Sequence, residues 1–265
     1  MKIKQVSDLH LEFGPMSLPN NENANVLVLG GDIFVAETLN RSPQSPLYEK
    51  AEAYRKFISA VCNDYENVIM VCGNHEHYNG CFDATHSIIR DEFKYNNFYL
   101  LDDESVTIGD TMFYGATLWT DLNRGCPITE SQYESINDYK IIRRGAKHGY
   151  RKLLPRDTKI NHSASMHILE KTIENAEKVY VATHYAPSYA SIDPKYKTDY
   201  YGNGFYASDI SEFILDRPQI KVWSHGHIHC NNDYMIGECR VVSNPRGYVG
   251  YELNPDFMED FIVEM

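Results

Sequence analysis

Seven side chains of the types that bind transition metals follow short apolar runs in this 265-residue sequence. They are two carboxylates, one amide and four imidazoles: Asp8, His10, Asp32, Asn74, His184, His227 and His229. This mixture of donors suits Mn, Fe, Zn or Ni better than Ca or Mg alone. A catalytic ion takes about four to six ligands and keeps a position open, so seven protein ligands are too many for one ion. They fit two divalent metal ions that share one carboxylate.

Asp32 is the best candidate for the shared ligand, because the preceding Gly30-Gly31 turn lets the backbone approach closely. Two divalent ions, the two carboxylates and a bridging hydroxide leave a net charge of about +1 at the centre. Such a centre attracts an anionic phosphoester, and a metal pair lowers the pKa of bound water. We therefore expect a bridging hydroxide to attack phosphorus, with no protein nucleophile.

The candidate ligands follow β-rich runs that are typical of strands buried on both faces. The expected strands are residues 2–6, 26–29, 68–71, 179–182 and 220–223. Helical periodicity is found between them, over residues 48–64, 85–93 and 163–176. Alternating strands and helices predict an α/β fold, in which ligands gather beyond the carboxyl ends of the strands. Residues that are distant in sequence can therefore meet at one site.

The remaining segments predict further strands and one irregular region. Strands are expected over residues 98–101, 105–108 and 111–117, and a hairpin over 234–236 and 239–243. Residues 121–162 are less regular and richer in charge, so we interpret them as an insertion or lid over the site. No linker rich in Pro, Gly or Ser divides the chain, and we expect residues 1–265 to form one domain.

Composition narrows the possible partners. The net charge of −12 argues against broad nucleic-acid binding, which depends on neutralising phosphates with Lys and Arg. It is compatible with a small phosphorylated substrate. The sequence has no apolar stretch of about 18 residues, so no membrane association is expected. Six cysteines without a CxxC pair, and no signal-peptide pattern, favour a reduced cytoplasmic protein.

The ligand-bearing segments SDLH, GGD, GNHE, THYAPS and GHIH resemble, in order, the five signature blocks of the calcineurin-like metallophosphoesterase superfamily. The resemblance implies a four-layer αββα sandwich of two mixed β-sheets flanked by helices. It also implies how the ligands divide between the two ions. Asp8, His10, Asp32 and His229 would hold one ion, and Asp32, Asn74, His184 and His227 the other.

Three further segments look like blocks of uncharacterised bacterial and phage members of this superfamily. They are GATLWTD at residues 115–121, NDYKIIR at 137–143 and NPRGY at 244–248. This second resemblance supplies no substrate.

His75, beside Asn74, is by resemblance the general acid that protonates the leaving oxygen. Histidine suits this role because its pKa lies near neutrality. In the alternative interpretation, His75 only orients Asn74 or a water molecule.

Four residues are candidates for contact with substrate. Arg246, Arg143 and Arg144 have guanidinium groups that can bind phosphate through paired hydrogen bonds. His162 lies in the suspected lid and would approach the substrate from there. The alternatives are a solvated charged turn for the Arg143-Arg144 pair and structural roles for the others.

The sequence is compatible with several functions. A phosphoesterase that prefers a small phosphodiester or nucleotide competes with a phosphomonoesterase or phosphoprotein phosphatase. A catalytically inert scaffold that keeps the fold is the alternative of another class. A dinuclear hydrolase of amides would share the metals, although the order of the blocks does not fit it.

Overall fold

The computed structural model describes residues 1–265 and contains two large β-sheets. The first has the strand order β13-β1-β2-β3-β4. Its strands β1 to β4 are parallel, and β13 pairs antiparallel with β1. Their bounds are β1 Lys2–Val6, β2 Val26–Leu29, β3 Asn67–Met70, β4 Phe98–Leu100 and β13 Ile262–Glu264.

The second sheet has the order β5-β6-β7-β8-β10-β9. Four central strands are parallel, and the edge strands β5 and β9 are antiparallel to their neighbours. The bounds are β5 Glu104–Ile108, β6 Thr111–Ala116, β7 Val179–Thr183, β8 Ile220–His225, β9 Asn232–Ile236 and β10 Cys239–Ser243. A small ribbon pairs β11 (Gly247–Tyr248) with β12 (Glu252–Leu253).

The two sheets pack face to face because their strands are apolar on both sides. In β2, Val26 and Val28 belong to the core between the sheets, whereas Leu27 and Leu29 face the opposite way. This division follows from the alternation of side chains along a strand. Phe113, Tyr180 and other residues of the second sheet complete the central core.

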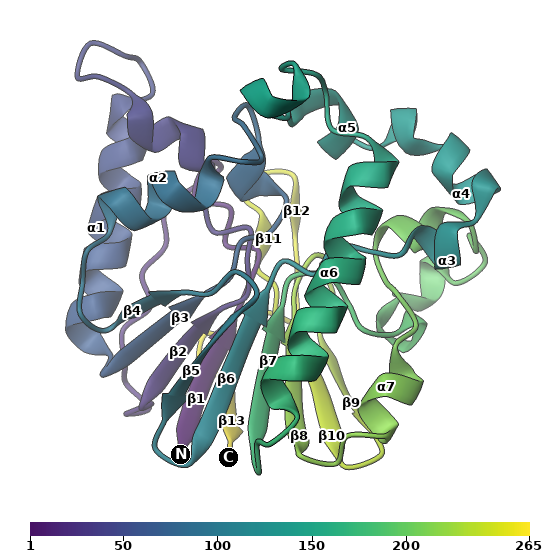
Figure 1. The fold of residues 1–265 in the computed structure, drawn as a ribbon. Coiled ribbons are helices and arrows are strands. Elements are labelled where there is room, and N and C mark those ends of the chain that lie inside the picture. The colour runs from purple at the N-terminus through teal and green to yellow at the C-terminus, as the bar shows by residue number, and fades with distance from the viewer.

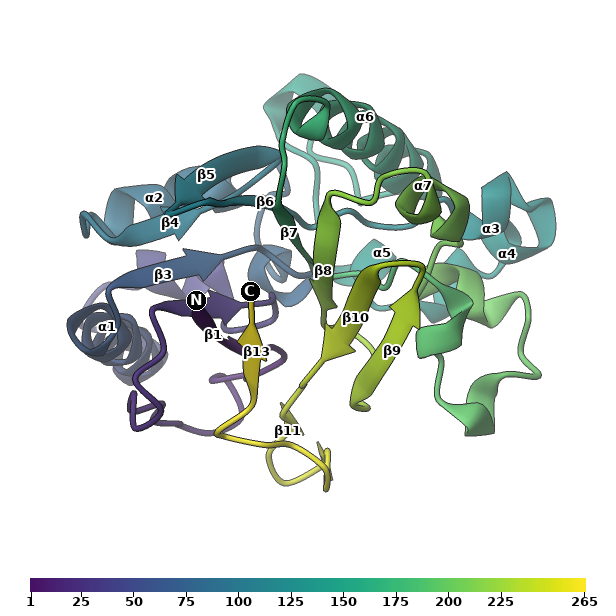
Figure 2. The ribbon, with the colours of Figure 1, turned by 90° about the horizontal axis from the view of Figure 1, so that it is seen from below.

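Helices cover the outer face of each sheet, as Figures 1 and 2 show. On the first sheet, α1 (Tyr48–Asp64) and α2 (Thr85–Glu92) bury Tyr54, Ile58 and Ile89. On the second sheet, α6 (Pro155–Ile173) and α7 (Ser211–Leu215) bury Leu169, Ile173 and Ile214. The predicted four-layer αββα sandwich is therefore confirmed.

The predicted elements match the observed ones closely, except that β11, β12 and β13 were not predicted and that α6 begins earlier than expected. Helix α6 begins at Pro155, whereas the sequence pattern placed its start at residue 163. Pro155 occupies the first helical position, where a missing N–H costs nothing. The Asp157 carboxylate accepts a hydrogen bond from the Leu154 N–H at 2.9 Å and caps the helix. The first two turns of α6 thus belong to the region expected to be irregular.

Short helices fill most of the 121–162 segment and the loops near it. Figure 1 shows α3, α4 and α5 beyond the ends of the strands. The bounds are α3 Leu122–Gly125, α4 Pro127–Ser131 and α5 Asp138–Ile141, with 3-10 helices η1 Ala36–Asn40, η2 His75–His77, η3 Tyr133–Ser135, η4 Ala146–His148, η5 Tyr189–Ser191, η6 Pro194–Tyr196 and η7 Gly202–Phe205. None of the helices has the length and apolar character needed to cross a bilayer.

Candidate metal centre

The loops that follow five strands meet at one edge of the sandwich. Ser7, after β1, pairs with Pro245, after β10, and this bridge joins the carboxyl ends of the two sheets. Asp8, Asp32, Asn74, His184 and the pair His227 and His229 follow β1, β2, β3, β7 and β8. The structure thus brings the predicted ligand-bearing loops together, as expected for the carboxyl ends of parallel strands.

One group of potential ligands comprises Asp8, His10 and His229. The Nε2 atoms of His10 and His229 lie 3.3 Å apart. His229 Nε2 lies 3.4 Å from Asp8 Oδ1. Asp8 and His10 are fully buried, and one ligand atom from each of the three residues lies within 4.8 Å of the others.

A second group comprises Asp32, His184 and His227. His184 Nε2 lies 3.4 Å from Asp32 Oδ1 and 3.1 Å from Asn74 Oδ1. The Asn74 amide, predicted from the GNHE segment, therefore lies beside this group.

Asp32 lies between the two groups. Its Oδ1 faces His184, and its Oδ2 lies 3.8 Å from His10 Nε2. The two oxygens of one carboxylate thus face different groups of ligands. This arrangement suits a bridging carboxylate, because each oxygen can serve one ion.

The donor set fits a pair of cations. The Nδ1–H of His184 donates to the Gly30 carbonyl at 2.9 Å, so its Nε2 faces Asp32 and Asn74. Burial alone would lower the pKa of His184, but the Asp32 and Asp8 carboxylates, with the hydrogen bond to the Gly30 carbonyl, together raise it to about 10. Nitrogen and oxygen lone pairs that converge in this way require a positive charge among them. A metal ion meets that requirement, with the ring orientation fixed from behind.

The backbone at four of these residues is left-handed. The φ angles are 52° at Asp8, 46° at His10, 55° at Asp32 and 64° at His227. For residues with a Cβ, this conformation costs about 1–2 kcal/mol each. Strain at ligand-bearing turns indicates that the fold places these side chains at some expense of stability.

Glu76 supports the turns that carry Asp32 and Asn74. Its buried carboxylate accepts hydrogen bonds from the backbone N–H groups of Asp32 (2.9 Å), Ile33 (2.6 Å) and Gly73 (2.6 Å). Gly73 is needed because an added Cβ would collide with Asp32 and with His184.

His75 lies against the first ligand group. Its Nε2 is 4.0 Å from Asp32 Oδ2 and 3.3 Å from the Tyr248 hydroxyl. Its Nδ1 lies 2.8 Å from Glu12 Oε1. The same Glu12 oxygen lies 3.2 Å from His10 Nδ1, so one carboxylate holds both imidazoles.

Charges around His75 favour its protonated form. Burial lowers the pKa of His75, but the negative charges of Asp32 and then Glu12 raise it by more than burial lowers it. The resulting pKa is about 9. An imidazolium at this position carries a proton on the side that faces the ligands.

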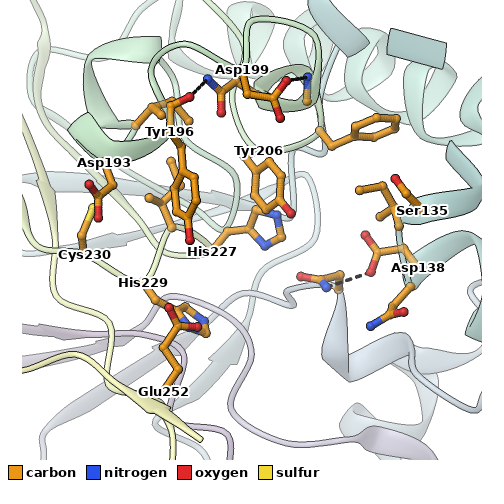
Figure 3. A pocket seen from close by; sticks show the side chains of 18 of the residues that line it. Ser135, Asp138, Asp193, Tyr196, Asp199, Tyr206, His227, His229, Cys230 and Glu252 are labelled. Atoms are coloured by element: carbon orange, nitrogen blue, oxygen red, sulfur yellow. Dashed lines mark hydrogen bonds and ion pairs between the residues drawn. The ribbon is translucent and has the colours of Figure 1, made fainter. Parts of the chain in front are cut away.

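A cavity of about 470 Å³ opens beside the centre and is lined by His227, His229 and Asn74. Residues 135–138 form part of its wall, and residues 192–206 contribute another part (Figure 3). The Tyr206 ring stacks on His227 at 5.1 Å between centroids. The charged residues of the wall are Asp138, Asp193, Lys195, Asp199 and Glu252.

The four predicted substrate contacts lie elsewhere. Arg246 donates to the carbonyls of Leu9, Gly14 and Pro15 at 3.1–3.2 Å. His162 is buried, with Nδ1 3.1 Å from the Leu118 carbonyl.

The two neighbouring arginines lie in the 121–162 segment. Arg144 pairs with Asp83 at 2.8 Å and with Asp157 at 3.5 Å. Arg143 is exposed. The structure brings none of the four predicted contacts to the wall of the cavity.

Several residues near the ligands were not identified from the sequence. Glu12 could have been noticed from its spacing, because it follows His10 by two residues within SDLHLE. Asp138 and Tyr206 have no local signal, since only the tertiary fold brings them to the site.

Comparisons with known proteins agree with this geometry. The family model of calcineurin-like phosphoesterases matches residues 1–231. An uncharacterized protein of Acanthamoeba polyphaga mimivirus is 27% identical, over 93% of this chain and 91% of that protein.

Two solved structures share the fold. A phosphopantetheinyl hydrolase from Mycobacterium tuberculosis aligns with a TM-score of 0.62 at 13% identity, over 93% of this chain and 89% of that one. A dimetal phosphatase from Danio rerio aligns with a TM-score of 0.53 at 14% identity, over 94% and 88%.

Proposed function

This chain belongs to the calcineurin-like phosphoesterase family and is a metal-dependent phosphoester hydrolase, and we propose that it acts with two divalent ions on a small phosphoester. Asp32 would serve both ions. The first ion would also take Asp8, His10 and His229, and the second Asn74, His184 and His227. The observation that carries this proposal is that the two oxygens of Asp32 face different ligand groups.

The metal pair would supply charge neutralisation for the phosphoryl group and a lowered pKa for water. Manganese, iron, zinc and nickel all suit the mixed nitrogen and oxygen donors. The chain's own residues would orient these ligands and keep them away from bulk solvent, since five of the seven are buried.

His75 would donate the proton that the leaving oxygen needs. Glu12 holds its Nδ1, so the proton on Nε2 points toward Asp32 and Tyr248. A general acid of this kind contributes about 10²–10⁴-fold to a rate.

The cavity supports a small substrate. Its volume of about 470 Å³ is within the usual range for small-molecule sites. Its wall carries four carboxylates and one lysine, and that lysine pairs with Asp193 at 3.1 Å. A wall of this charge disfavours a long polyanion, whereas its tyrosines suit a ring. We therefore favour a small phosphodiester or nucleotide over a phosphoprotein or nucleic acid.

The test compares bis-p-nitrophenyl phosphate with p-nitrophenyl phosphate, using protein loaded in turn with each of the four metals. We expect metal-dependent turnover of the diester. Strong turnover of the monoester without the diester would refute the preference for diesters and favour a phosphomonoesterase. Folded protein that binds two ions but hydrolyses neither compound, nor a panel of nucleotides, would contradict the proposed function altogether.

A further inference from the structure

Asp138, the first residue of α5, places a buried carboxylate behind the proposed metal centre. The residue is 5% exposed. Its Oδ1 accepts hydrogen bonds from Asn74 Nδ2 at 2.9 Å and from the Tyr78 hydroxyl at 2.8 Å. Its Oδ2 accepts one from the Tyr185 hydroxyl at 3.2 Å. All three donors are neutral, and no lysine or arginine pairs with this carboxylate.

Each of the three donors touches a residue of the centre. Asn74 Oδ1 lies 3.1 Å from His184 Nε2. The Tyr78 ring stacks on His75, with 4.1 Å between centroids. The Tyr185 ring lies 4.2 Å from that of His227. One carboxylate from the 121–162 segment is therefore in contact with several supports of the centre at once.

The bond from Asn74 to Asp138, with a second one from Asn74 Nδ2 to the Tyr78 hydroxyl at 3.2 Å, decides which end of the Asn74 amide faces the ion. An amide has one oxygen, which can ligate a cation, and one NH₂ group, which can only donate. Donation of Nδ2 to Asp138, dashed in Figure 3, turns Oδ1 toward His184. The flipped amide would set its oxygen against a carboxylate and its NH₂ against the cation, so both contacts would be unfavourable.

We propose that Asp138 is a positioning residue that holds Asn74 for the second ion, and that it thereby links occupancy of that ion to the 121–162 segment. The inference rests on the proposed two-ion function. The segment is then part of the metal centre as well as part of the cavity wall. Correct docking of α5 becomes a condition for tight binding of the second ion.

The test measures binding of Mn²⁺ and Zn²⁺ by calorimetry, without substrate, in the wild type and in Asp138→Ala and Asp138→Asn. In Asp138→Ala we expect the affinity for one of the two ions to fall about 10–100-fold, as for other residues that orient metal ligands. The other ion should bind as before. Asp138→Asn should have a smaller effect, because its single oxygen can still accept from Asn74. It also keeps the shape of the side chain and serves if Asp138→Ala does not fold.

Asp157→Ala is the matched control. Asp157 is a buried carboxylate of the same segment that caps α6 and pairs with Arg151, and it has no contact with Asn74. We expect it to lower thermal stability without selective loss of one ion. Selective loss of one ion in Asp157→Ala as well would overturn the role of Asp138, since general weakening of the segment would explain both results.

The absorption spectrum of the Co²⁺-loaded protein gives a readout that a merely structural role would not change. We expect the bands of one Co²⁺ to shift in Asp138→Ala at saturating metal, because Asn74 loses the acceptor that orients it, and to shift less in Asp138→Asn. Unchanged affinities and spectra in both Asp138 variants would refute this role and leave the proposed function intact. Wild-type protein that binds two ions but is inert to phosphoesters would contradict the proposed function and leave this role intact.

Discussion

The two sides of the proposed metal centre are held by different parts of the chain. On one side, Glu12 contacts the Nδ1 atoms of His10 and His75 and lies two residues after His10. On the other side, Asp138 contacts Asn74 across a separation of 64 residues. In both cases a carboxylate that is not a proposed ligand fixes the direction of a side chain that is. The support of His10 by Glu12 is local, whereas the contacts of Glu12 with His75 and of Asp138 with Asn74 both depend on the tertiary fold.

Because of this difference, substitutions in different parts of the chain should weaken binding of different ions. The contact between Glu12 and His10 lies within the loop after β1. The side of Asp138 needs the 121–162 segment to dock, since α5 carries the carboxylate. Changes in that segment should therefore affect mainly the ion at Asn74, and changes in the loop after β1 mainly the ion at His10.

Asp32→Ala should remove the distinction between the sides, because Asp32 faces both. We expect kcat/KM to fall by more than about 10³-fold, beyond the cost of removing a single electrostatic group. Metal analysis should find that both ions bind less tightly. Retention of two tightly bound ions would show that Asp32 is not shared.

His75→Ala should reduce kcat by about 10²–10⁴-fold while both ions stay bound. The loss should be largest for substrates with poor leaving groups and small for p-nitrophenyl esters, because a good leaving group needs no proton. An equal loss for all leaving groups would instead favour the role in which His75 orients Asn74 or water.

Glu12→Gln should reduce kcat/KM by about 10–100-fold, because the neutral amide holds His10 and His75 less firmly. Metal titration should show weaker binding of one ion, and this should be the ion that Asp138→Asn does not affect. If both variants weaken binding of the same ion, Glu12 and Asp138 do not support different sides of the centre.

Arg246→Ala should have the smallest effect on catalysis. We expect KM to change by less than about threefold, since the guanidinium donates to backbone carbonyls. Thermal unfolding should show that the free energy of unfolding falls by about 1–3 kcal/mol, because those carbonyls lose their donors. An increase in KM of tenfold or more, without a loss of stability, would support direct substrate binding.

The sequence was informative where local pattern determines structure. The runs before Asp8, Asp32 and His184 predicted their strands, and parallel strands necessarily bring their carboxyl ends together. The start of α6 was missed because Pro155 and Asp157 lie within a charged region without apolar periodicity.

The direction of a charged side chain could not be predicted. Arg246 lies near the expected edge, yet its guanidinium turns to the carbonyls of the loop after β1. Asp138 lies within the NDYKIIR segment, and nothing in its neighbours indicates contact with Asn74. Such contacts follow from how distant loops pack, which one sequence does not reveal.

The left-handed backbone at Asp8, His10, Asp32 and His227 has a consequence for engineering and evolution. Glycine adopts this conformation without a Cβ penalty, so a selection for heat resistance alone would enrich glycine at these four positions. Each such replacement would relieve about 1 kcal/mol of strain and delete a proposed metal ligand. Any library designed to raise the melting temperature of this protein should therefore hold these four codons fixed.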